Sequence, residues 1–424
     1  MPESKLSLFL AGDAMITEPW SQIEEPDFLK LVAEMRAADA TIVNLETLIH
    51  EFKGYAQADN GGTYVASPPA VAVDLKWAGI DMLSCANNHA FDYGSTGILE
   101  TIENAEAAGL IVAGIGANLQ AARQAAFLGC PGGTVAMVSM AATFIPYGRA
   151  SQSRSGMRGR PGLNPLALTK RGLTTITPAM ARRLDRLRFG RKSDRKLPRS
   201  ALTSFLGATL LIEEKARIGG GRGIDPADLD GNTAAIDNAV AAADLTIVSL
   251  HAHQQGGWLR RFAHRVVALG ADVVFIHGPH EVRGIEMHAG KPIFYSMGDF
   301  VYEPHRVARF PTEMYDKHGL GPEATVKELW PIWENAIGLN SKRKTFESFS
   351  AVLDFNGSRL ERIRLLPLDL QFGAPAEMRG RPRLADATLG RRIVEEVAAL
   401  SLKRGTVVRY DAARNEGLVE LPRP

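Results

Sequence analysis

The chain of 424 residues has few cysteines and no long hydrophobic run. Two cysteines, Cys85 and Cys130, are too few for a disulfide framework, and neither has a partner at metal-ligand spacing. No apolar run approaches the roughly 18 residues of a membrane-spanning helix. The first residues also lack the basic start and the apolar segment of a signal peptide. We therefore expect a soluble, cytoplasmic protein without a membrane segment.

The charge is nearly balanced in total and uneven in its distribution. A formal net charge of +2 indicates no class of partner. Between Arg149 and Arg199, however, 15 Lys or Arg stand against two acids, Asp185 and Asp194. Such a segment attracts polyanions, or else it is a solvated loop. Its only aromatic residue is Phe189, so the pattern does not favour nucleic acid as the partner.

Outside that segment, short apolar runs alternate with helical patterns, which predicts an α/β fold with buried strands. The expected strands are 5–11, 41–45, 80–84, 110–113, 135–140, 245–250, 272–276 and 292–297. The expected helices are 27–38, 69–78, 96–108, 119–127, 178–188, 233–243, 258–269 and 389–403, the last of which closes the chain. Residues 303–346 read as irregular. Beyond them, 350–355 and 360–366 flank Asn356-Gly357 and predict a β-hairpin.

Polar side chains follow six of the expected strands, at the point where each strand ends. Because the carboxyl ends of parallel strands share one edge of a sheet, these side chains should meet in one crevice. They are Gly12-Asp13, Asn44 with Glu46, Asn87-Asn88-His89, His251 with His253, His277 with His280, and Gly298-Asp299. Imidazoles and carboxylates are ligands that Mn, Fe and Zn favour, and paired metal ions activate water for attack on a phosphoryl group.

Each of these residues also has an ordinary explanation when it is taken alone. Gly-Asp after a strand is commonly a turn, Glu46 suits a solvated position, and histidines two residues apart occur in exposed loops. Asn87-Asn88 fits the Asx-turn chemistry that precedes a helix. The joint placement of the whole set at strand ends, rather than any single residue, favours the metal interpretation.

Six stretches stand in a distinctive order: GDAM (12–15), NLE (44–46), NNHAFDYG (87–94), SLHAH (249–253), HGPH (277–280) and GKPIFYSMGDFVYE (290–303). This ordered set resembles the CapA family, which is named for capsule and poly-γ-glutamate synthesis and belongs to the calcineurin-like metallophosphoesterase superfamily. The resemblance covers most of residues 6–303 and implies a metallophosphatase-like four-layer α-β-β-α sandwich. We expect that domain to span 1–303, with a basic insertion at about 147–228. Residues 304–424 would complete the same domain.

The resemblance also implies roles for individual residues. One or two divalent ions (Mn, Fe, Zn, Mg or Ca) would bind Asp13, Glu46, Asn88, His251, His277 and His280. His89 would protonate a leaving oxygen, Asp92 would hold its imidazole in the donor tautomer, and His253 would act as a base or supply a further nitrogen. The stretch RPGLNPL (160–166) also looks like part of the family, and in and beside it we expect Arg158, Arg160 and Asn164 to contact substrate.

Four departures separate the chain from typical phosphoesterases and relatives. The first motif, Asp-x-His in phosphoesterases, is here Asp13-Ala14-Met15, which lacks the imidazole. Most family members have His-Trp-Gly where this chain has His251-Ala252-His253, and the final histidine pair is spaced i, i+3. Members linked to the capsule polymer usually carry an N-terminal anchor, which this sequence does not show.

Three functions remain open on this evidence. The first is a metal-dependent hydrolase of phosphoesterase type, acting on a phosphorylated or polyanionic substrate in poly-γ-glutamate or capsule synthesis. The second is suggested by anchorless relatives that resemble metal-dependent peptide epimerases, in which paired acid/base groups exchange an α-proton of a peptide substrate. The third is a non-catalytic scaffold whose basic segment binds the polymer.

Overall fold

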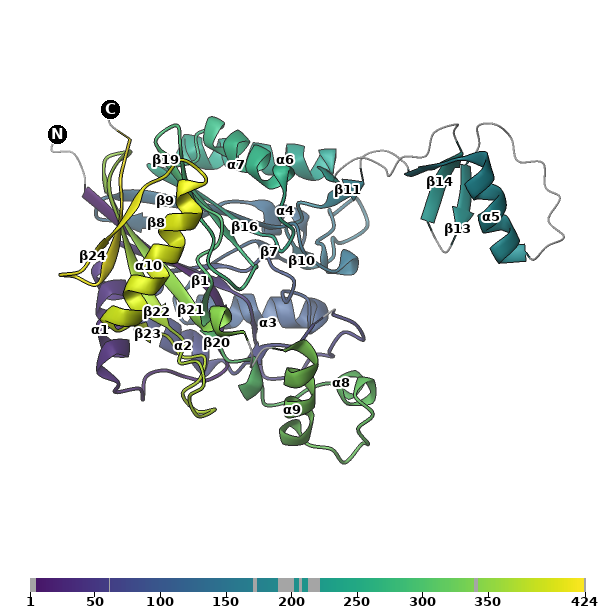
Figure 1. Cartoon of the computed structure of the whole chain (residues 1–424), viewed down its shortest axis with the longest axis horizontal. Coiled ribbons are helices and arrows are strands. Elements are labelled where there is room, and N and C mark those ends of the chain that lie inside the picture. The colour runs from purple at the N-terminus through teal and green to yellow at the C-terminus, as the bar shows by residue number, and fades with distance from the viewer. Residues whose placement is uncertain are drawn as a thin grey trace. The chain divides into compact units, whose positions relative to one another are not determined.

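The structure is a computed structural model that describes residues 5–60, 62–170, 174–189, 202–205, 208–212, 222–338 and 342–422. The chain forms two compact units, shown with their elements in Figure 1. The larger unit comprises Met1–Leu166 and Asp230–Pro424, and the smaller unit comprises Ala167–Leu229. Residues 147–166 of the expected insertion thus belong to the larger unit, and its basic residues at 190–201 lie outside the described residues.

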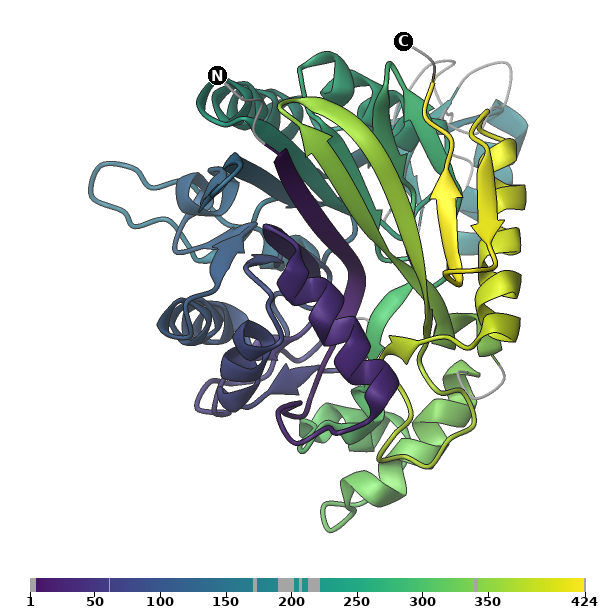
Figure 2. The same ribbon diagram turned by 90° about the vertical axis from the view of Figure 1, so that its left-hand side faces the viewer.

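The first of two large sheets in the described part of the larger unit carries the N-terminal strand and the C-terminal hairpins (Figure 2). Its strands are β1 (Lys5–Met15), β2 (Ala40–Leu45), β5 (Met82–Ser84), β6 (Ile111–Ala113), β20 (Asp299–Tyr302), β21 (Glu347–Asn356), β22 (Arg359–Asp369), β23 (Arg383–Leu384), β24 (Val408–Asp411) and β25 (Glu416–Val419). In the described residues they run in the order β24-β25-β22-β21-β1-β2-β5-β6, with β20 beside β1 and β23 beside β22. Strands β1, β2, β5 and β6 are parallel. The predicted hairpin is confirmed as β21 and β22.

The second sheet packs against the first. Its strands are β8 (Ala126–Cys130), β9 (Gly133–Ala141), β16 (Leu245–His251), β17 (Val273–His277), β18 (Ile285–His288) and β19 (Lys291–Phe294). Within the described part of the chain the order is β18-β19-β17-β16-β9-β8, and β9, β16, β17 and β19 are parallel. Each sheet therefore has a block of parallel strands whose carboxyl ends share one edge.

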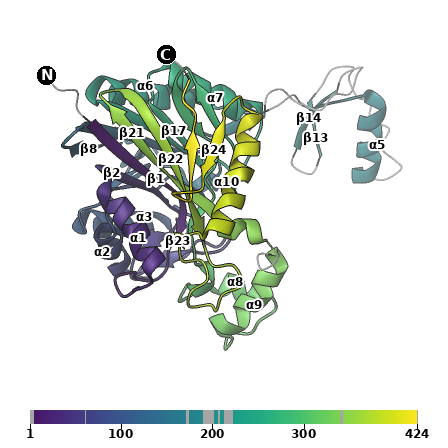
Figure 3. The same ribbon diagram turned by 60° about the vertical axis from the view of Figure 1, so that its left-hand side comes forward.

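Helices cover the outer faces of both sheets, as Figure 3 shows. On the side of the first sheet lie α1 (Pro26–Ala37), α2 (Ala70–Trp77) and α3 (Gly94–Ala107). On the side of the second sheet lie α6 (Pro226–Ala242) and α7 (Gly257–Ala268). Helix α4 (Leu119–Arg123) contacts β9. Helix α10 (Ala387–Leu402) packs against β22 and β24. The order of layers is α-β-β-α, as the family resemblance implies.

Alternate residues of β1 are buried in two different cores. Leu6, Leu8 and Leu10 face the second sheet, together with residues of β9, β16 and β17. Phe9 and Ala11 face the opposite way, toward α1 and its neighbours. Burying one such large side chain stabilises the fold by about 1.5–3 kcal/mol, and a slip of one residue would turn every side chain to the wrong face. The register of β1 is therefore fixed, and so is the position of the polar residues at its end.

Several expected elements differ in the structure. The helix expected over 119–127 ends at Arg123 because the chain turns into β8. The strand expected over 292–297 ends at Phe294. The helix expected to close the chain does not do so, because the hairpin of β24 and β25 follows α10. The stretch 303–346, expected to be irregular, contains α8 (Thr312–Lys317) and α9 (Val326–Ile337).

Helix α9 has start and stop signals in its sequence that the proline inside it obscures. Thr325 and Glu328 form a capping box, in which each side chain bonds to the backbone of the other residue. Gly338 ends the helix in the left-handed conformation. Pro331 lies inside the helix, where it removes one backbone donor, so the local pattern reads as broken.

The smaller unit has its own elements and a small core. They are β11 (Leu168–Lys170), β12 (Thr174–Ile176), α5 (Pro178–Phe189), β13 (Leu202–Phe205), β14 (Ala208–Ile212) and β15 (Arg222–Ile224). Ile176, Ala181 and Ile212 are buried together, with Leu184 packed against them. The predicted helix over 178–188 is confirmed as α5.

Short elements of the larger unit are β3 (Leu48–Ile49), β4 (Ala66–Ser67), β7 (Ile115–Gly116), β10 (Gly162–Leu163) and 3-10 turns at Pro146–Gly148, Pro304–Arg306 and Arg343–Phe346.

We searched the helices in the described ranges for membrane spans. None combines the length and the apolar character that crossing a bilayer requires.

Candidate metal centre

Polar strand ends from both sheets meet at one edge. Cα register pairs His251 at the end of β16 with His277 at the end of β17. It also pairs Asp13, near the end of β1, with Asn44 of β2 and with Asp299 at the start of β20. All five are buried, each with 1% or less of its surface exposed. The expected convergence is confirmed for these residues, and it places imidazoles next to carboxylates.

A bulge in β1 directs Asp13 into the site. The register with β2 shifts immediately before Asp13, so Gly12 is the extra residue. A Cβ on Gly12 would lie 1.8 Å from the carbonyl oxygen of Gly298, so only glycine permits this approach. Asp13 Oδ2 accepts a hydrogen bond from the N–H of Gly278 at 2.9 Å, and Oδ1 accepts one from Asn44 Nδ2 at 2.7 Å. These bonds hold the carboxylate in one orientation.

His251 stands between two groups of possible ligand atoms. Its Nδ1 lies 3.0 Å from His277 Nδ1, which in turn lies 3.4 Å from Asp13 Oδ1. Its Nε2 lies 3.1 Å from His253 Nε2 and 3.7 Å from Glu46 Oε1. Each group supplies two imidazole nitrogens and one carboxylate oxygen within 4.8 Å of one another, which is a ligand set typical of Zn, Mn or Fe.

The carboxylate of Glu46 is buried without a hydrogen-bond partner among the described residues. The nitrogens that approach it are His251 Nε2 at 3.7 Å and His280 Nε2 at 3.8 Å from Oε1. Burying an ionised carboxylate without partners is costly, and the group takes up a proton instead. A divalent ion coordinated by these oxygens would satisfy them. The residues present therefore fit a bound metal.

His280 enters the site from a strained turn, and it brings Asp299 with it. The backbone φ of His280 is +54°, in the left-handed region that costs a residue other than glycine about 1 kcal/mol or more. Its Nδ1 lies 2.7 Å from Asp299 Oδ1 and 3.9 Å from Asp13 Oδ2. Asp299 Oδ2 has no partner within the described part of the chain. Asp299 is absent from the ligands predicted from the sequence, although Gly298-Asp299 is one of the polar strand ends.

Burial and mutual proximity shift the pKa values of these groups in opposite directions. Burial, reinforced by the Asp13 carboxylate, raises the pKa of Glu46 well above its usual value. Burial also disfavours ionised Asp13, but bonding to His277 and its charge outweigh burial and lower the pKa of Asp13 to about 2. Burial and neighbouring imidazoles lower the pKa of His251 well below normal. His253 keeps an exposed edge, but the protein packed around its ring and the neighbouring His280 lower its pKa to about 4. The side chains of these two histidines are therefore neutral at pH 7, and the neutral imidazole is the form that binds metals.

The two asparagines that follow β5 lie in different environments. Asn87 Nδ2 donates to the carbonyl of Leu45 at 2.7 Å, and its Oδ1 accepts from the N–H of His89 at 3.1 Å, so Asn87 shapes the turn. Asn88 Oδ1 is inaccessible and has no partner among the residues described. An amide oxygen of this kind is available to a cation. The role of Asn88 as a ligand stays a prediction.

His89 and Asp92 form a buried pair. His89 Nδ1 lies 2.8 Å from Asp92 Oδ2, which also accepts a hydrogen bond from the N–H of Val65 at 3.2 Å. Burial raises the pKa of Asp92, and the charge of His89 opposes that shift. His89 is close enough to His251 and His253 to lower their pKa values electrostatically. A carboxylate at Nδ1 orients the ring and leaves Nε2 for another partner.

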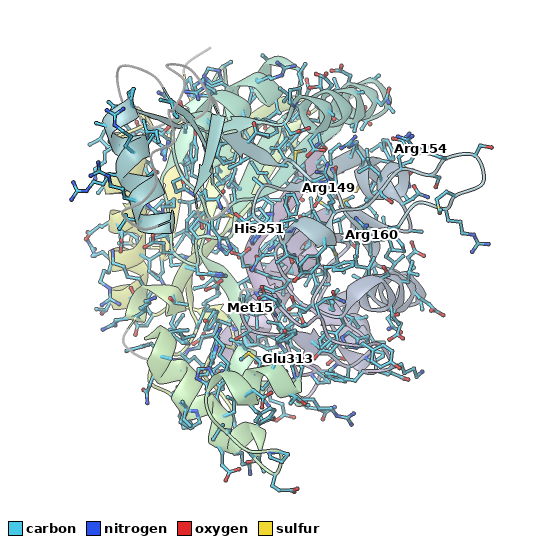
Figure 4. All side chains as sticks on the ribbon, turned by 90° about the vertical axis from the view of Figure 1, so that its right-hand side faces the viewer. Met15, Arg149, Arg154, Arg160, His251 and Glu313 are labelled. Carbon is cyan, nitrogen blue, oxygen red and sulfur yellow. The ribbon has the colours of Figure 1, made fainter. Side chains whose placement is uncertain are left out.

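Met15 stands where phosphoesterases have a histidine, and its side chain lies in a hydrophobic cluster. It is 5% exposed and packs with Tyr93 and Tyr302. Met15 and His251 are both labelled among the side chains in Figure 4. The imidazole of His253, from the loop after β16, lies against His251 instead. This position makes His253 a candidate for the nitrogen that β1 lacks.

A chain of three buried serines supports His277 from behind. Ser84 of β5, Ser139 of β9 and Ser249 of β16 each have 1% or less of their surface exposed. Ser249 Oγ lies 2.8 Å from His277 Nε2 and 2.7 Å from Ser84 Oγ, which lies 2.9 Å from Ser139 Oγ. A hydroxyl partner at Nε2 leaves Nδ1 as the nitrogen that faces Asp13. Sequence reasoning missed these serines, whose signal is a small hydroxyl residue within an apolar strand or at its end.

The three residues expected to bind substrate lie in contrasting environments. Arg158 and Arg160 are exposed, and Arg160 is labelled in Figure 4. Asn164 is fully buried, and its Nδ2 donates to Ser139 O at 2.8 Å and to Asn232 Oδ1 at 2.7 Å. Asn164 therefore connects β9 to α6 in the interior, and its side chain offers no surface to a substrate. Substrate binding by the two arginines stays a prediction.

A further group of close ligand atoms, outside the candidate centre, is formed by His264 of α7 with Glu286 and His288 of β18. Glu286 already accepts hydrogen bonds from Arg260 Nη2 at 2.7 Å and Tyr295 Oη at 2.8 Å. The rings of His264 and His288 stack with centroids 3.6 Å apart and planes 8° apart. Parallel rings direct their nitrogen lone pairs side by side, so these do not converge on one ion. The group is an ion-pair network between α7 and β18.

The family model described as "Bacterial capsule synthesis protein PGA_cap" matches residues 7–304, and the chain belongs to this family. An uncharacterized protein of Sinorhizobium fredii, y4sH, is 31% identical over 98% of this chain and 93% of its own length. The PGA biosynthesis protein CapA of Bacillus subtilis is 24% identical over 70% of this chain and 63% of its own length. The family expected from the six sequence stretches is thereby confirmed.

Two solved structures resemble the chain at a lower level. A hypothetical protein from Thermus thermophilus has a TM-score of 0.40 and 13% identity, over 86% of this chain and 99% of that one. A protein from Mycoplasma pneumoniae described as a novel phosphatase has a TM-score of 0.38 and 9% identity, over 87% of this chain and 94% of that one. No functional conclusion follows from likeness at this level. The mixed α/β class is defined by the chain's own two sheets.

Proposed function

We propose that this protein is a divalent-metal-dependent hydrolase of phosphoesterase type that acts on an anionic substrate in capsule or poly-γ-glutamate synthesis. One observation carries the proposal: both oxygens of the buried Glu46 lack hydrogen-bond partners among the described residues, with two imidazoles within 4 Å. The family description supplies the context of capsule synthesis.

The candidate ligands come from both sheets. Those that would hold one or two ions are Asp13, Glu46, His251, His277 and His280, with oxygen atoms of Asn88 and Asp299 in addition. Bound ions of this kind polarise an oxyanion and lower the pKa of a bound water. The chain's own part is to hold the ligands in place: Asn44 and Gly278 orient Asp13, and Ser249 orients His277.

His89 is the candidate proton donor to the leaving oxygen. Asp92 accepts the Nδ1–H of His89, fixes the orientation of the ring, and leaves Nε2–H as the donor. An alkoxide is a poor leaving group and needs this proton, whereas a nitrophenolate does not. A positioned general acid typically accelerates such a step by about 10²–10⁴-fold.

The contrast between leaving groups gives the test of this role. His89→Ala should lower kcat for an alkyl phosphate by about a hundredfold or more, and kcat for p-nitrophenyl phosphate far less. Metal content should remain that of the unmodified protein. His288→Ala, a histidine substitution on β18 outside the site, is the matched control and should change neither rate. Equal losses with both substrates would show that His89 has another role.

The same assay separates the two remaining functions. An unmodified protein that binds metal and releases no phosphate from either ester contradicts hydrolysis. If it instead introduces solvent deuterium at the α-carbon of a peptide, the centre serves epimerisation. If it holds no metal and only retains an anionic polymer, it is a scaffold.

A further inference from the structure

An open cavity of about 540 Å³ lies beside the candidate metal centre. One of its lining residues, His280, belongs to the centre, because it lies within 4 Å of Asp13 and Glu46. Tyr302, another lining residue, has its ring 6.2 Å from that of His280. Lys342–Thr345, where the 3-10 turn before β21 begins, contribute most of the remaining lining. The volume is in the range of ordinary small-molecule sites. A substrate bound at the metal centre would therefore have this cavity next to it.

Three consecutive cations line the cavity. Lys342, Arg343 and Lys344 are all exposed. Arg343 is paired with Glu347, and Lys344 Nζ lies 2.5 Å from Glu396 Oε1. Solvent screens the exposed cation of each pair, so such a pair contributes about 1 kcal/mol, and an incoming anion can compete for both cations. Lys342 has no ion pair with any residue that the structure describes.

The carboxylates near the cavity do not cancel these charges. Glu281, the acidic residue of the lining, is paired with Arg283. Glu347 is shared between Arg343 and Arg392, whose Nη2 lies 2.6 Å from Oε1. Among the residues that line the cavity, the three cations Lys342, Arg343 and Lys344 therefore stand against one carboxylate, that of Glu281. The excess is positive, and Lys342 carries the unpaired charge.

We propose that this cavity binds a second anionic group of the substrate, a carboxylate or a phosphate, with Lys342 as the main contact. The proposal takes one point from the proposed function, namely that the reacting bond of the substrate lies at the neighbouring metal centre. A Lys ammonium is a compact point charge that suits either anion. An anion held there fixes the substrate relative to the centre, so the cavity selects substrates with a second negative charge next to the reacting bond.

The experiment measures binding to the full chain by fluorescence anisotropy, with two probes. One is a fluorescein-labelled pentaglutamate, and the other is a labelled neutral peptide that carries a single phosphoserine. Lys342→Ala should weaken binding of the preferred probe about tenfold and Lys342→Glu more, because a charge-assisted contact is lost and then reversed. Lys327→Ala, an exposed lysine of α9 that does not line the cavity, is the matched control and should bind as the unmodified protein does.

The two probes distinguish the two anions. Preference for pentaglutamate assigns a carboxylate to the cavity, and preference for the phosphopeptide assigns a phosphate. Unchanged binding of both probes by the two Lys342 variants overturns the proposal. So does binding that disappears with a chelator and is insensitive to Lys342.

The outcome is independent of the hydrolase assay. A protein that releases no phosphate yet loses probe binding in the Lys342 variants keeps the anion site and refutes the proposed function. A protein that hydrolyses phosphoesters but binds both probes equally in all variants refutes the anion site and keeps the proposed function.

Discussion

The hydroxyl of Ser249 decides which nitrogen of His277 faces the candidate metal ligands. Ser249 Oγ occupies Nε2 at 2.8 Å, and Nδ1 is then left toward Asp13 and His251. The serine chain behind it reaches from β16 to β5 and β9, so strands of both sheets support one imidazole. Ser249 is not itself a candidate ligand, and it would influence a bound metal through the candidate ligand His277. Partners of this kind commonly change metal affinity by 10–100-fold.

Ser249→Ala should therefore weaken metal binding about tenfold, without loss of the fold. The measurement is a titration of the metal-free protein with Mn or Zn, followed by calorimetry. Ser350→Ala is the control, because Ser350 is also fully buried in a central strand and its Oγ has no partner among the described residues. An equal change in affinity for both variants would mean that His277 does not depend on the hydroxyl.

The candidate ligands that sequence reasoning proposed share one property: each lies within a few residues of the end of an apolar run. Asp13, His251 and His277 could be placed because the ends of parallel strands meet at one edge. Asp299 and Ser249 were missed for different reasons. Asp299 depends on the left-handed turn that brings His280 to it, and Ser249 lies inside its strand, so only the folded neighbours show what each contacts.

At the scale of elements, the ion-pair network of Glu286 holds α7 against β18. Burial disfavours the ionised carboxyl, but the hydrogen bonds from Arg260, Tyr295 and His264 outweigh it, so the pKa of Glu286 falls from 4.5 to about 2. A carboxyl whose pKa is lower in the folded state stabilises the fold above its unfolded pKa. That stabilisation is lost as the pH falls from about 4.5 toward 2.

Glu286→Gln should lower the free energy of unfolding by about 1–2 kcal/mol at pH 7, a modest value because Arg260 is exposed and screened by solvent. The difference from the unmodified protein should shrink steadily between pH 4.5 and pH 2. Urea unfolding at a series of pH values measures it, with Glu420→Gln, an exposed position directly after β25, as the control. A difference in the free energy of unfolding that stays constant across that range would show that the charge of Glu286 is not its cause.

Most elements could be predicted because their apolar period is strong, as in β1, α7 and the β21–β22 hairpin. The errors lie where two signals compete. Helix α9 contains Pro331 between the capping box at Thr325 and the stop at Gly338, and the proline obscured both signals. The expected helix after Leu119 ends early because Ala126–Cys130 pair with β9, a contact that the local sequence does not reveal.

At the scale of the whole molecule, the candidate centre connects the two sheets. Asp13 and Glu46 come from β1 and the end of β2 in the first sheet, whereas His251 and His277 end two strands of the second. An ion bound to both sets would tie the sheets together at their shared edge. A ligand that binds the folded chain alone stabilises it, by about 2.7 kcal/mol at a hundred times its Kd.

Metal removal should therefore lower the thermal stability of the unmodified protein by a few degrees, and Mn, Fe or Zn should restore it. In Glu46→Gln the metal-dependent increment should be lost, whereas the metal-free stability should barely change. The reason is that burial raises the pKa of Glu46, so a neutral amide resembles the protonated acid. Glu286→Gln serves as the control, because it removes a buried carboxylate elsewhere and should keep the full metal-dependent increment.

The most direct test is the metal content of the protein purified without chelator, measured by elemental analysis beside Asp13→Ala, Glu46→Gln and His280→Ala. We predict one or two equivalents of Mn, Fe or Zn in the unmodified protein and in His89→Ala, and clear loss of metal in the other three. An unmodified protein that holds no divalent metal, and gains no thermal stability when any of these ions is added, would contradict the metal centre.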